Sequence, residues 1–203
     1  MKLKKNVVRK VSVILFIAGI VAVSVLAGRL AEHASSYLRT ESLEKEAANL
    51  ERVLEKREEH LSLVENEIRD RLYLLAKIIH TEQGSQRPED LPSKIAVGHV
   101  VLNRVRSPLF PNTIEEVIFQ PNQFSPTFDG SWERKEPMEM DFKAAIAAIR
   151  GERVYSEEGV LLNDALFFMN PRISGRNNVR WFRRALSFVG TLGGHEFFVP
   201  RVH

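Results

Sequence analysis

The feature that most constrains the fold is a long helical pattern of apolar residues. From Leu43 onward these residues recur four and three positions apart, with Glu, Lys and Arg dense between them. The stripe consists of Leu43, Ala47, Leu50, Leu54, Leu61, Val64, Ile68, Leu75 and Ile78, with Arg57 and Arg71 at the two remaining positions. This near-heptad spacing predicts a long amphipathic or coiled-coil helix. A single helix that packs against its own domain fits the same spacing.

The first 28 residues have a different composition. Basic residues are dense in Met1 to Lys10, and Val11 to Gly28 carry no charge. Because roughly 17 to 25 apolar residues span a bilayer as a helix, this segment predicts a single transmembrane anchor. The basic head places the N-terminus in the cytoplasm and exports everything after Arg29. The alternative is a signal peptide cleaved after Val25-Leu26-Ala27.

The chain therefore divides into three predicted parts: an anchor at 1–28, a stalk at 29–71 and a globular domain at 72–203. A helical stalk of about 40 residues would be roughly 60 Å long. The heptad spacing leaves homo-oligomerisation through the stalk open.

Composition narrows the class of function. A hydrophobic content of 44% supports one modest core. The net charge of +3, part of which lies in the first ten residues, argues against a dedicated nucleic-acid binder. The absence of cysteine excludes disulfides, thiolate zinc sites and a cysteine nucleophile. No HExxH, GxSxG, phosphate-loop or dinucleotide motif is present, so no metal or cofactor is predicted.

Glu82 lies where the helical pattern stops. The segment from Thr81 to Gln86 carries no apolar side chain, and Gly84 is predicted to close the helix in a left-handed conformation. Ser93 is predicted to cap a second helix. Partial burial between two helices would raise the pKa of Glu82, as a general acid needs near neutral pH. The alternative is a solvated glutamate in the last helical turn.

The remaining pattern predicts short elements. Thr113 and Glu116 form a capping box for a short helix. A helix is expected over 138–150, closed by Gly151, and 165–170 should pair with 195–199 as a hairpin. The fold class is therefore mainly α (α+β), a small helical domain with a short β-hairpin.

A loop from Gln123 to Trp132 is rich in amides and aromatic rings. Such loops suit sugars, because apolar sugar faces stack on rings while hydroxyls bond to amides. Phe124, Phe128 and Trp132 are equally well explained as core anchors.

Four blocks of sequence resemble a known family. They are LAKIIHTEQG, KIAVGHVVLNRVRSPLFPNTIEEVIFQPNQFS, ALFFMNP and GGHEFF. Together they resemble the catalytic domain of SleB-type cell wall hydrolases, the spore cortex-lytic family, over roughly 72–199. The resemblance implies a lysozyme-like helical fold that cleaves the glycan strand of peptidoglycan, with Glu82 at the place of the general acid. The family's usual Glu-Ala-Arg-Gly-Glu is replaced here by Glu82 to Gln86, and the loop before Ala96 is longer.

Glycosidic cleavage by two carboxylates needs a second acidic group, and only Glu82 is a strong candidate. The resemblance implies the mechanism of lytic transglycosylases, which need only one glutamate. The C6 hydroxyl of muramic acid attacks the anomeric carbon, and the glutamate serves as both acid and base. Asp129 and Asp141 are fallback partners for a hydrolase. The predicted substrate-binding residues are Gln123, Phe124, Ser125, Trp132, Tyr155 and Asn170. The alternatives are an amidase and a non-catalytic, membrane-anchored protein that binds the wall.

Overall fold

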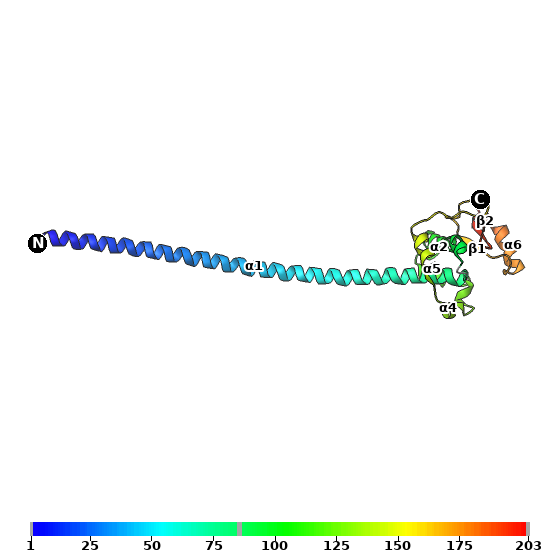
Figure 1. The fold of residues 1–203 in the computed structure, drawn as a ribbon, viewed down its shortest axis with the longest axis horizontal. Helices are drawn as coiled ribbons and strands as arrows, with labels where there is room; N and C mark the ends of the chain where they lie inside the picture. Colours follow the sequence, from blue (N-terminus) through cyan, green and yellow to red (C-terminus); the bar gives the residue numbers. More distant parts are fainter. Residues whose placement is uncertain (1, 85–86, 202–203) are drawn as a thin grey trace. The chain divides into compact units, whose positions relative to one another are not determined.

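The computed structural model describes the backbone of residues 2–84 and 87–201, and the side chains of residues 18–84 and 87–201. The chain forms two compact units, Met1–Leu63 and Val64–His203. Helix α1, Lys2–Glu82, supplies the first unit and opens the second (Figure 1). The long helix predicted from the apolar spacing is therefore present. The second unit begins at Val64, inside the segment predicted as stalk.

The apolar stripe of the first unit faces solvent. Leu43, Leu50, Leu54 and Leu61 are each more than half exposed. Association of the stalk with a second copy stays a prediction.

The predicted membrane span falls partly outside the described side chains. Residues 11–17 belong to the segment whose side chains are not described. Among the described residues, no helix is both long and apolar enough to cross a bilayer.

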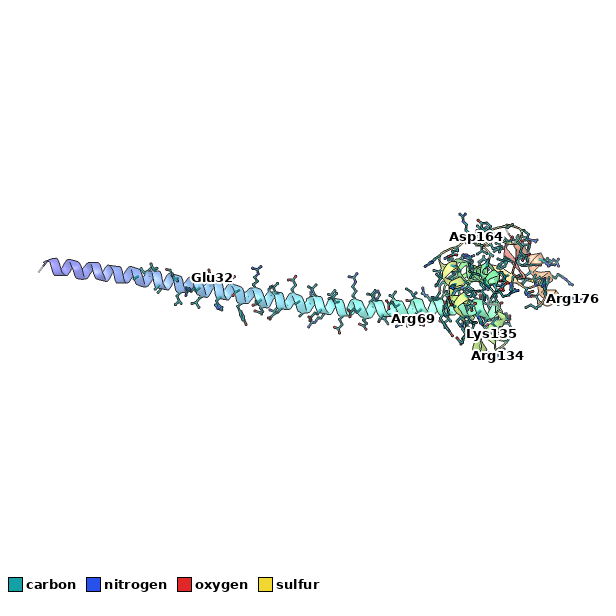
Figure 2. All side chains as sticks on the ribbon, viewed as in Figure 1. Glu32, Arg69, Arg134, Lys135, Asp164 and Arg176 are labelled. Atoms are coloured by element: carbon teal, nitrogen blue, oxygen red, sulfur yellow. The ribbon has the colours of Figure 1, made fainter. Side chains whose placement is uncertain are left out.

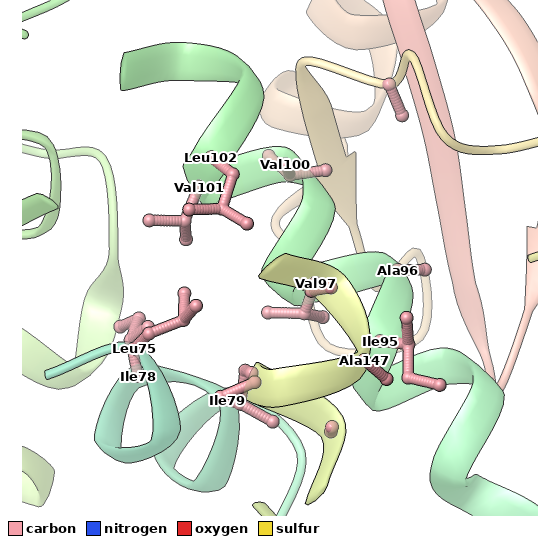
Figure 3. Close-up of a cluster of buried hydrophobic side chains, with 14 of the residues drawn as sticks. Leu75, Ile78, Ile79, Ile95, Ala96, Val97, Val100, Val101, Leu102 and Ala147 are labelled. Carbon is pink, nitrogen blue, oxygen red and sulfur yellow. The ribbon is translucent and has the colours of Figure 1, made fainter. Parts of the chain in front are cut away.

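The core of the second unit forms where three helices meet. The last turns of α1 bury Leu75, Ile78 and Ile79 completely against α2, Leu91–Arg106, and α5, Glu139–Ile149 (Figure 3). The close contact of α2 with α5 requires glycine at position 98. A Cβ there would lie 2.8 Å from Cβ of Ala148 and 3.2 Å from Cδ1 of Ile79. This packing therefore fixes the direction of the last turn of α1, which ends at Glu82.

Two predicted helix boundaries differ from the structure. Gly84 is not left-handed, since its φ lies outside the positive range. Ser93 is not a cap but lies inside α2, which begins at Leu91 after a 3-10 turn, Pro88–Asp90. The reason is Pro92, which is favoured in the first turn of a helix because it lacks the N–H that would stay unpaired there.

Two other predictions from local sequence patterns, the capping box at Thr113 and the helix end at Gly151, are confirmed. The hydroxyl of Thr113 accepts a 3.2 Å hydrogen bond from the Glu116 amide at the start of α3, Ile114–Ile118. Helix α5 ends before Gly151, whose φ is 73°. The aromatic loop contains a 3-10 turn, Ser125–Thr127, and a short helix α4, Ser131–Arg134.

The sheet has one strand more than predicted. Strand β1, Phe167–Met169, pairs antiparallel with β3, His195–Pro200, as expected. The two strands do not form the predicted hairpin, however, because a helix and another strand lie between them in the chain. The missed strand β2, Leu186–Leu192, completes the order β1-β3-β2 and also pairs antiparallel with β3. A register shift between Phe188 and Gly190 breaks its alternation, which explains why the pattern did not reveal it. Helix α6, Arg176–Ala185, connects β1 to β2.

A buried ion pair joins these helices behind Glu82. Nζ of Lys94 on α2 lies 2.6 Å from Oδ1 of Asp141 on α5, and both side chains are 0% exposed. The second oxygen of Asp141 lies 2.8 Å from Nδ1 of His80 and accepts a 2.8 Å hydrogen bond from the Met138 amide. Nζ of Lys94 also donates a hydrogen bond to the carbonyl of Gln83, the residue after Glu82. The pair thereby ties the end of α1 to two other helices.

Replacement of Lys94 by methionine should strongly destabilise the second unit. It would leave the Asp141 carboxylate buried without its cation, a change that typically costs about 3–5 kcal/mol. Denaturant unfolding followed by tryptophan fluorescence measures the loss, because Trp132 and Trp181, the chain's two tryptophans, both lie in this unit. The control is Lys143→Met, which removes an exposed pair with Glu139 and should unfold like the parent. Equal midpoints for the two variants would show that the pair has no such role.

Candidate active site

The second unit contains a cavity of about 470 Å³ with Glu82 in its wall. Helical and sheet segments both contribute to it. Its lining consists of Glu82, Arg104, Asn122, Gln123, Ser125, Phe128, Phe167, Phe168, Met169, Asn170, Ile173, Ser174, Asn178, Trp181, Phe182 and His195. A carboxyl group, amides and aromatic rings thus face one space, which is the composition expected of a carbohydrate site.

Glu82 is the last residue of α1 and is partly buried. Burial raises its pKa to about 7, and the negative charge of Asp129 adds to the rise. The positive charges of Arg104 and Lys135 oppose it. The carboxyl group therefore holds a proton in a substantial fraction of molecules near neutral pH, which is the state a general acid needs.

Arg104 is a buried cation in the same cavity. Arg104 is only 4% exposed, and its Nε donates a 2.9 Å hydrogen bond to the carbonyl of Leu166. The guanidinium carbon lies 4.9–5.4 Å from the ring centres of Phe110, Phe124 and Phe167. Within the described chain, Nη1 has no hydrogen-bond partner. A fixed, desolvated cation thus lines the same cavity as Glu82.

The charges of Glu82 and Arg104 influence each other's pKa. Burial lowers the pKa of Arg104 to about 10, and the charge of Glu82 acts against this decrease. Arg104 therefore remains cationic at neutral pH. Each group favours the charged form of the other.

The predicted substrate-binding residues divide into two groups. Gln123, Ser125 and Asn170 line the cavity with Glu82. The predicted aromatic residues Phe124, Trp132 and Tyr155 are not among the lining residues. The three predicted polar residues therefore lie in the same cavity as the Glu82 carboxyl group, and the three predicted aromatic residues do not.

Each of those three aromatic residues has another environment. Phe124 is 1% exposed and packs against the guanidinium of Arg104. Trp132 packs edge-on against Phe119, with ring centres 5.1 Å apart. Tyr155 forms an isolated β-bridge with Leu161.

Two exposed aromatic residues that line the cavity, Phe128 and Trp181, were not among the predicted substrate-binding residues, although Phe128 was considered as either a stacking ring or a core anchor. Trp181 is 54% exposed, and Phe128 is exposed as well. Trp181 lies on α6 in a strongly amphipathic basic segment, a signal that could have separated it from core aromatics. Exposed rings at a polar cavity are suited to stacking on sugar faces.

The two fallback carboxylates have different environments. Asp141 is committed to the buried ion pair with Lys94; burial would raise its pKa, but its hydrogen bonds with Lys94 and the Met138 amide hold the pKa below the usual range. Asp129 is exposed, and its Oδ1 accepts a 2.7 Å hydrogen bond from the Ser131 amide. Hydrogen bonding to the side chain of Ser131, and then to its amide, lowers the pKa of Asp129, so this carboxyl group is ionised at neutral pH.

Gln83, which differs from the family pattern, has a structural contact. Its Nε2 donates a 3.1 Å hydrogen bond to Nδ1 of His195, and both residues are buried. Burial lowers the pKa of His195, which keeps the ring neutral near pH 7. The contact links the end of α1 to the β2–β3 turn, where Gly193 has a φ of 58°. Two further altered positions, Ser85 and Gln86, lie outside the described residues.

Comparison with known proteins identifies the family to which the globular domain belongs. Residues 88–198 match the model of the Cell Wall Hydrolase family. The chain belongs to this family. The match includes Arg104, Ser125 and Asn170, whereas Glu82 lies just before it.

The chain has relatives of similar sequence and fold. It is 38% identical over 98 residues to the spore cortex-lytic enzyme of Bacillus subtilis, covering 48% of this chain and 28% of that protein. It is 32% identical over 120 residues to the spore cortex-lytic enzyme of Oceanobacillus iheyensis, covering 59% of this chain and 39% of that protein. The crystal structure of the catalytic domain of the Bacillus cereus SleB protein is 30% identical, with a TM-score of 0.50, over 64% of this chain and 91% of that domain. The chain thus matches well under half the length of its curated relatives and nearly all of a catalytic domain.

Replacement of Glu82 by glutamine should stabilise the protein above neutral pH. Because the pKa is about 7 when folded and near 4.5 when unfolded, stability falls as pH rises between these values and then stays lower. Glutamine has the same shape and does not titrate. The melting temperature of Glu82→Gln should therefore exceed that of the parent by more at pH 8 than at pH 5. A difference that does not depend on pH would mean that the carboxyl group is not desolvated.

Proposed function

We propose that the second unit cleaves the glycan strand of peptidoglycan between N-acetylmuramic acid and N-acetylglucosamine, as a lytic transglycosylase with Glu82 as its acid and base. The observation that carries this proposal is a partly buried glutamate with a pKa of about 7 in a cavity lined by amides and rings. Membership of the cell wall hydrolase family supports the choice of polymer.

The reaction needs two proton transfers through one carboxyl group. Glu82 first donates its proton to the glycosidic oxygen, and the bond from that oxygen to C1 of muramic acid breaks. The Glu82 carboxylate then accepts the proton of the C6 hydroxyl as its oxygen bonds to C1. The products are a free hydroxyl on N-acetylglucosamine and a 1,6-anhydro ring on muramic acid. No water is consumed, and Glu82 ends in its starting protonated state.

Arg104 has a defined part in this cycle. When Glu82 has lost its proton, the carboxylate is poorly solvated, and a fixed cation stabilises it without reorganisation. Arg104 is held in place by the Leu166 carbonyl and by aromatic rings, so its charge is preorganised.

The other lining residues are suited to holding the sugars. Gln123, Ser125 and Asn170 offer amide and hydroxyl groups for sugar hydroxyls and acetamido groups. Trp181 and Phe128 offer exposed rings for stacking. Remote contacts of this kind supply the binding energy that orients the scissile bond.

A hydrolase is the second candidate, and one observation favours it. Asp129 is ionised and close enough to Glu82 to raise the pKa of that residue. An ionised carboxylate beside a protonated one is the arrangement of inverting glycosidases, in which the base activates water. In that case muramic acid would carry a reducing end in place of the anhydro ring.

We also propose that residues 1–28 attach the chain to a membrane with the N-terminus in the cytoplasm. The basic first ten residues and the uncharged segment that follows support this orientation. The catalytic unit would then be exported to the wall side, and residues 29–71 would act as a spacer. The exposed apolar stripe supports homo-oligomerisation of that spacer.

Mass spectrometry of the fragments released from purified peptidoglycan tests the proposed reaction. The parent should release fragments with anhydro-muramic ends, and Glu82→Gln should release at least about a hundredfold less. Asp129→Asn is the matched control, since it neutralises a neighbouring carboxylate, and it should release the same anhydro products. Reducing ends that vanish in Asp129→Asn would establish the hydrolase, free peptides would indicate an amidase, and no release from any wall type would favour a binding protein.

The pH dependence of cleavage tests the role of Arg104. Removal of the cation raises the pKa of Glu82 further, so the alkaline limb of the rate profile should move to higher pH in Arg104→Gln. The maximum rate should fall roughly tenfold or more because the carboxylate form loses its stabilisation. Arg104→Lys retains the charge and should keep the alkaline limb of the parent. Identical limbs in all three proteins would refute electrostatic coupling between Arg104 and Glu82.

A further inference from the structure

Helix α6 has a charge pattern that folding does not explain. It contains four arginines and no acidic residue, in the sequence RNNVRWFRRA. Arg176 and Arg180, and Arg180 and Arg184, are four residues apart, a spacing at which like charges destabilise a helix. Arg176 also lies in the first turn, where the helix dipole disfavours a cation. Because this charge pattern destabilises the helix that carries it, a role in binding explains the pattern better than a role in folding.

The arginines surround a second concave site. A groove of about 690 Å³ is lined by Pro171, Ser174, Arg176, Val179, Arg180, Arg183 and Arg184. Arg183 is bound by both carboxylate oxygens of Glu196 and anchors α6 to β3. Arg176, Arg180 and Arg184 are exposed and form no ion pair within the described residues (Figure 2 labels Arg176 at the surface). Three cations are therefore available in the groove to an anionic ligand.

The groove adjoins the candidate active site through α6 itself. Asn178, Trp181 and Phe182 of the same helix line the cavity that contains Glu82. Ser174 lines both the cavity and the groove. A polymer held in the cavity would therefore carry its side groups toward the arginines.

We propose that the groove formed by Arg176, Arg180 and Arg184 binds the free carboxylates of the peptides attached to muramic acid. This inference rests on the proposed function, because it assumes that a glycan strand occupies the cavity. Arginine is suited to the task, since its planar N–H fork matches a carboxylate. Peptide carboxylates are favoured over phosphate because they belong to the same polymer as the bond to be cleaved. The domain would accordingly select glycan that carries acidic peptides over bare or amidated glycan.

Binding to modified walls tests the proposal independently of cleavage. The full chain, in detergent and with Glu82→Gln to prevent digestion, is sedimented with peptidoglycan freed of phosphate polymers. Half of the wall has its carboxyl groups amidated with carbodiimide and ammonia. The test variant is Arg180→Gln/Arg184→Gln, and the matched control is Arg150→Gln/Arg153→Gln, which removes two exposed arginines from outside the groove.

We expect amidation to weaken binding of the parent and of the control about three- to tenfold, as for two exposed ion pairs. The test variant should bind unmodified wall as weakly as the parent binds amidated wall, with no further loss on amidation. Equal binding by the test variant and the parent, or equal sensitivity of both to amidation, would overturn the proposal. So would an effect of the variant seen only on walls that retain phosphate polymers. If the active parent releases no glycan fragments, the proposed function fails, whereas sedimentation still reports on the groove.

Discussion

The site depends on one buried ion pair, between Lys94 and Asp141. Neither side chain has any exposed surface, so each charge is tolerable only because of the other and of the hydrogen bonds around them. Asp141 also contacts His80 and caps α5, while Lys94 bonds to the carbonyl of Gln83. The interaction thus determines where α1 ends, and with it the position of Glu82. A packed apolar core alone would hold the three helices together but would not bind that last carbonyl.

The chemistry of Glu82 follows from this position. The helix end brings the carboxyl group to a partly buried wall of the cavity, where desolvation raises its pKa to about 7. Arg104 opposes this rise from a site stabilised by aromatic rings and by the Leu166 carbonyl. The opposed effects leave the pKa near neutrality, so the group can both give and take a proton. The next residue, Gln83, binds His195 and connects the helical part to the sheet.

The sequence predicted those parts of the fold and the candidate site that rest on local rules. The apolar stripe indicated α1, the box at Thr113 indicated α3, and the polar break marked Glu82. The pairing of β1 with β3 was also predicted from two apolar runs, but the turn before β3 joins it to β2, so the two strands are not the hairpin that the pattern suggested. The placement of Gln123, Ser125 and Asn170 beside Glu82 agrees with their predicted roles, which remain to be tested.

What could not be predicted depends on contacts between distant segments. Lys94 and Asp141 are 47 residues apart, and neither lies in a motif that requires the other. Trp132 and Trp181 are both aromatic residues in polar surroundings, and only tertiary packing places one against Phe119 and the other in the cavity. Strand β2 escaped detection because its bulge disturbs the alternation that marks a strand. The arginine groove likewise becomes apparent only when α6 is seen between it and the cavity.

The most direct test of the central claim is an NMR titration of the Glu82 carboxyl carbon. The full chain would be labelled with ¹³C at glutamate carboxyl groups, and the Glu82 signal assigned by its loss in Glu82→Gln. The account predicts a midpoint near pH 7 for this signal. A midpoint near 4.5, the value of a solvated glutamate, would contradict it and would leave Glu82 as an ordinary residue at the end of a helix.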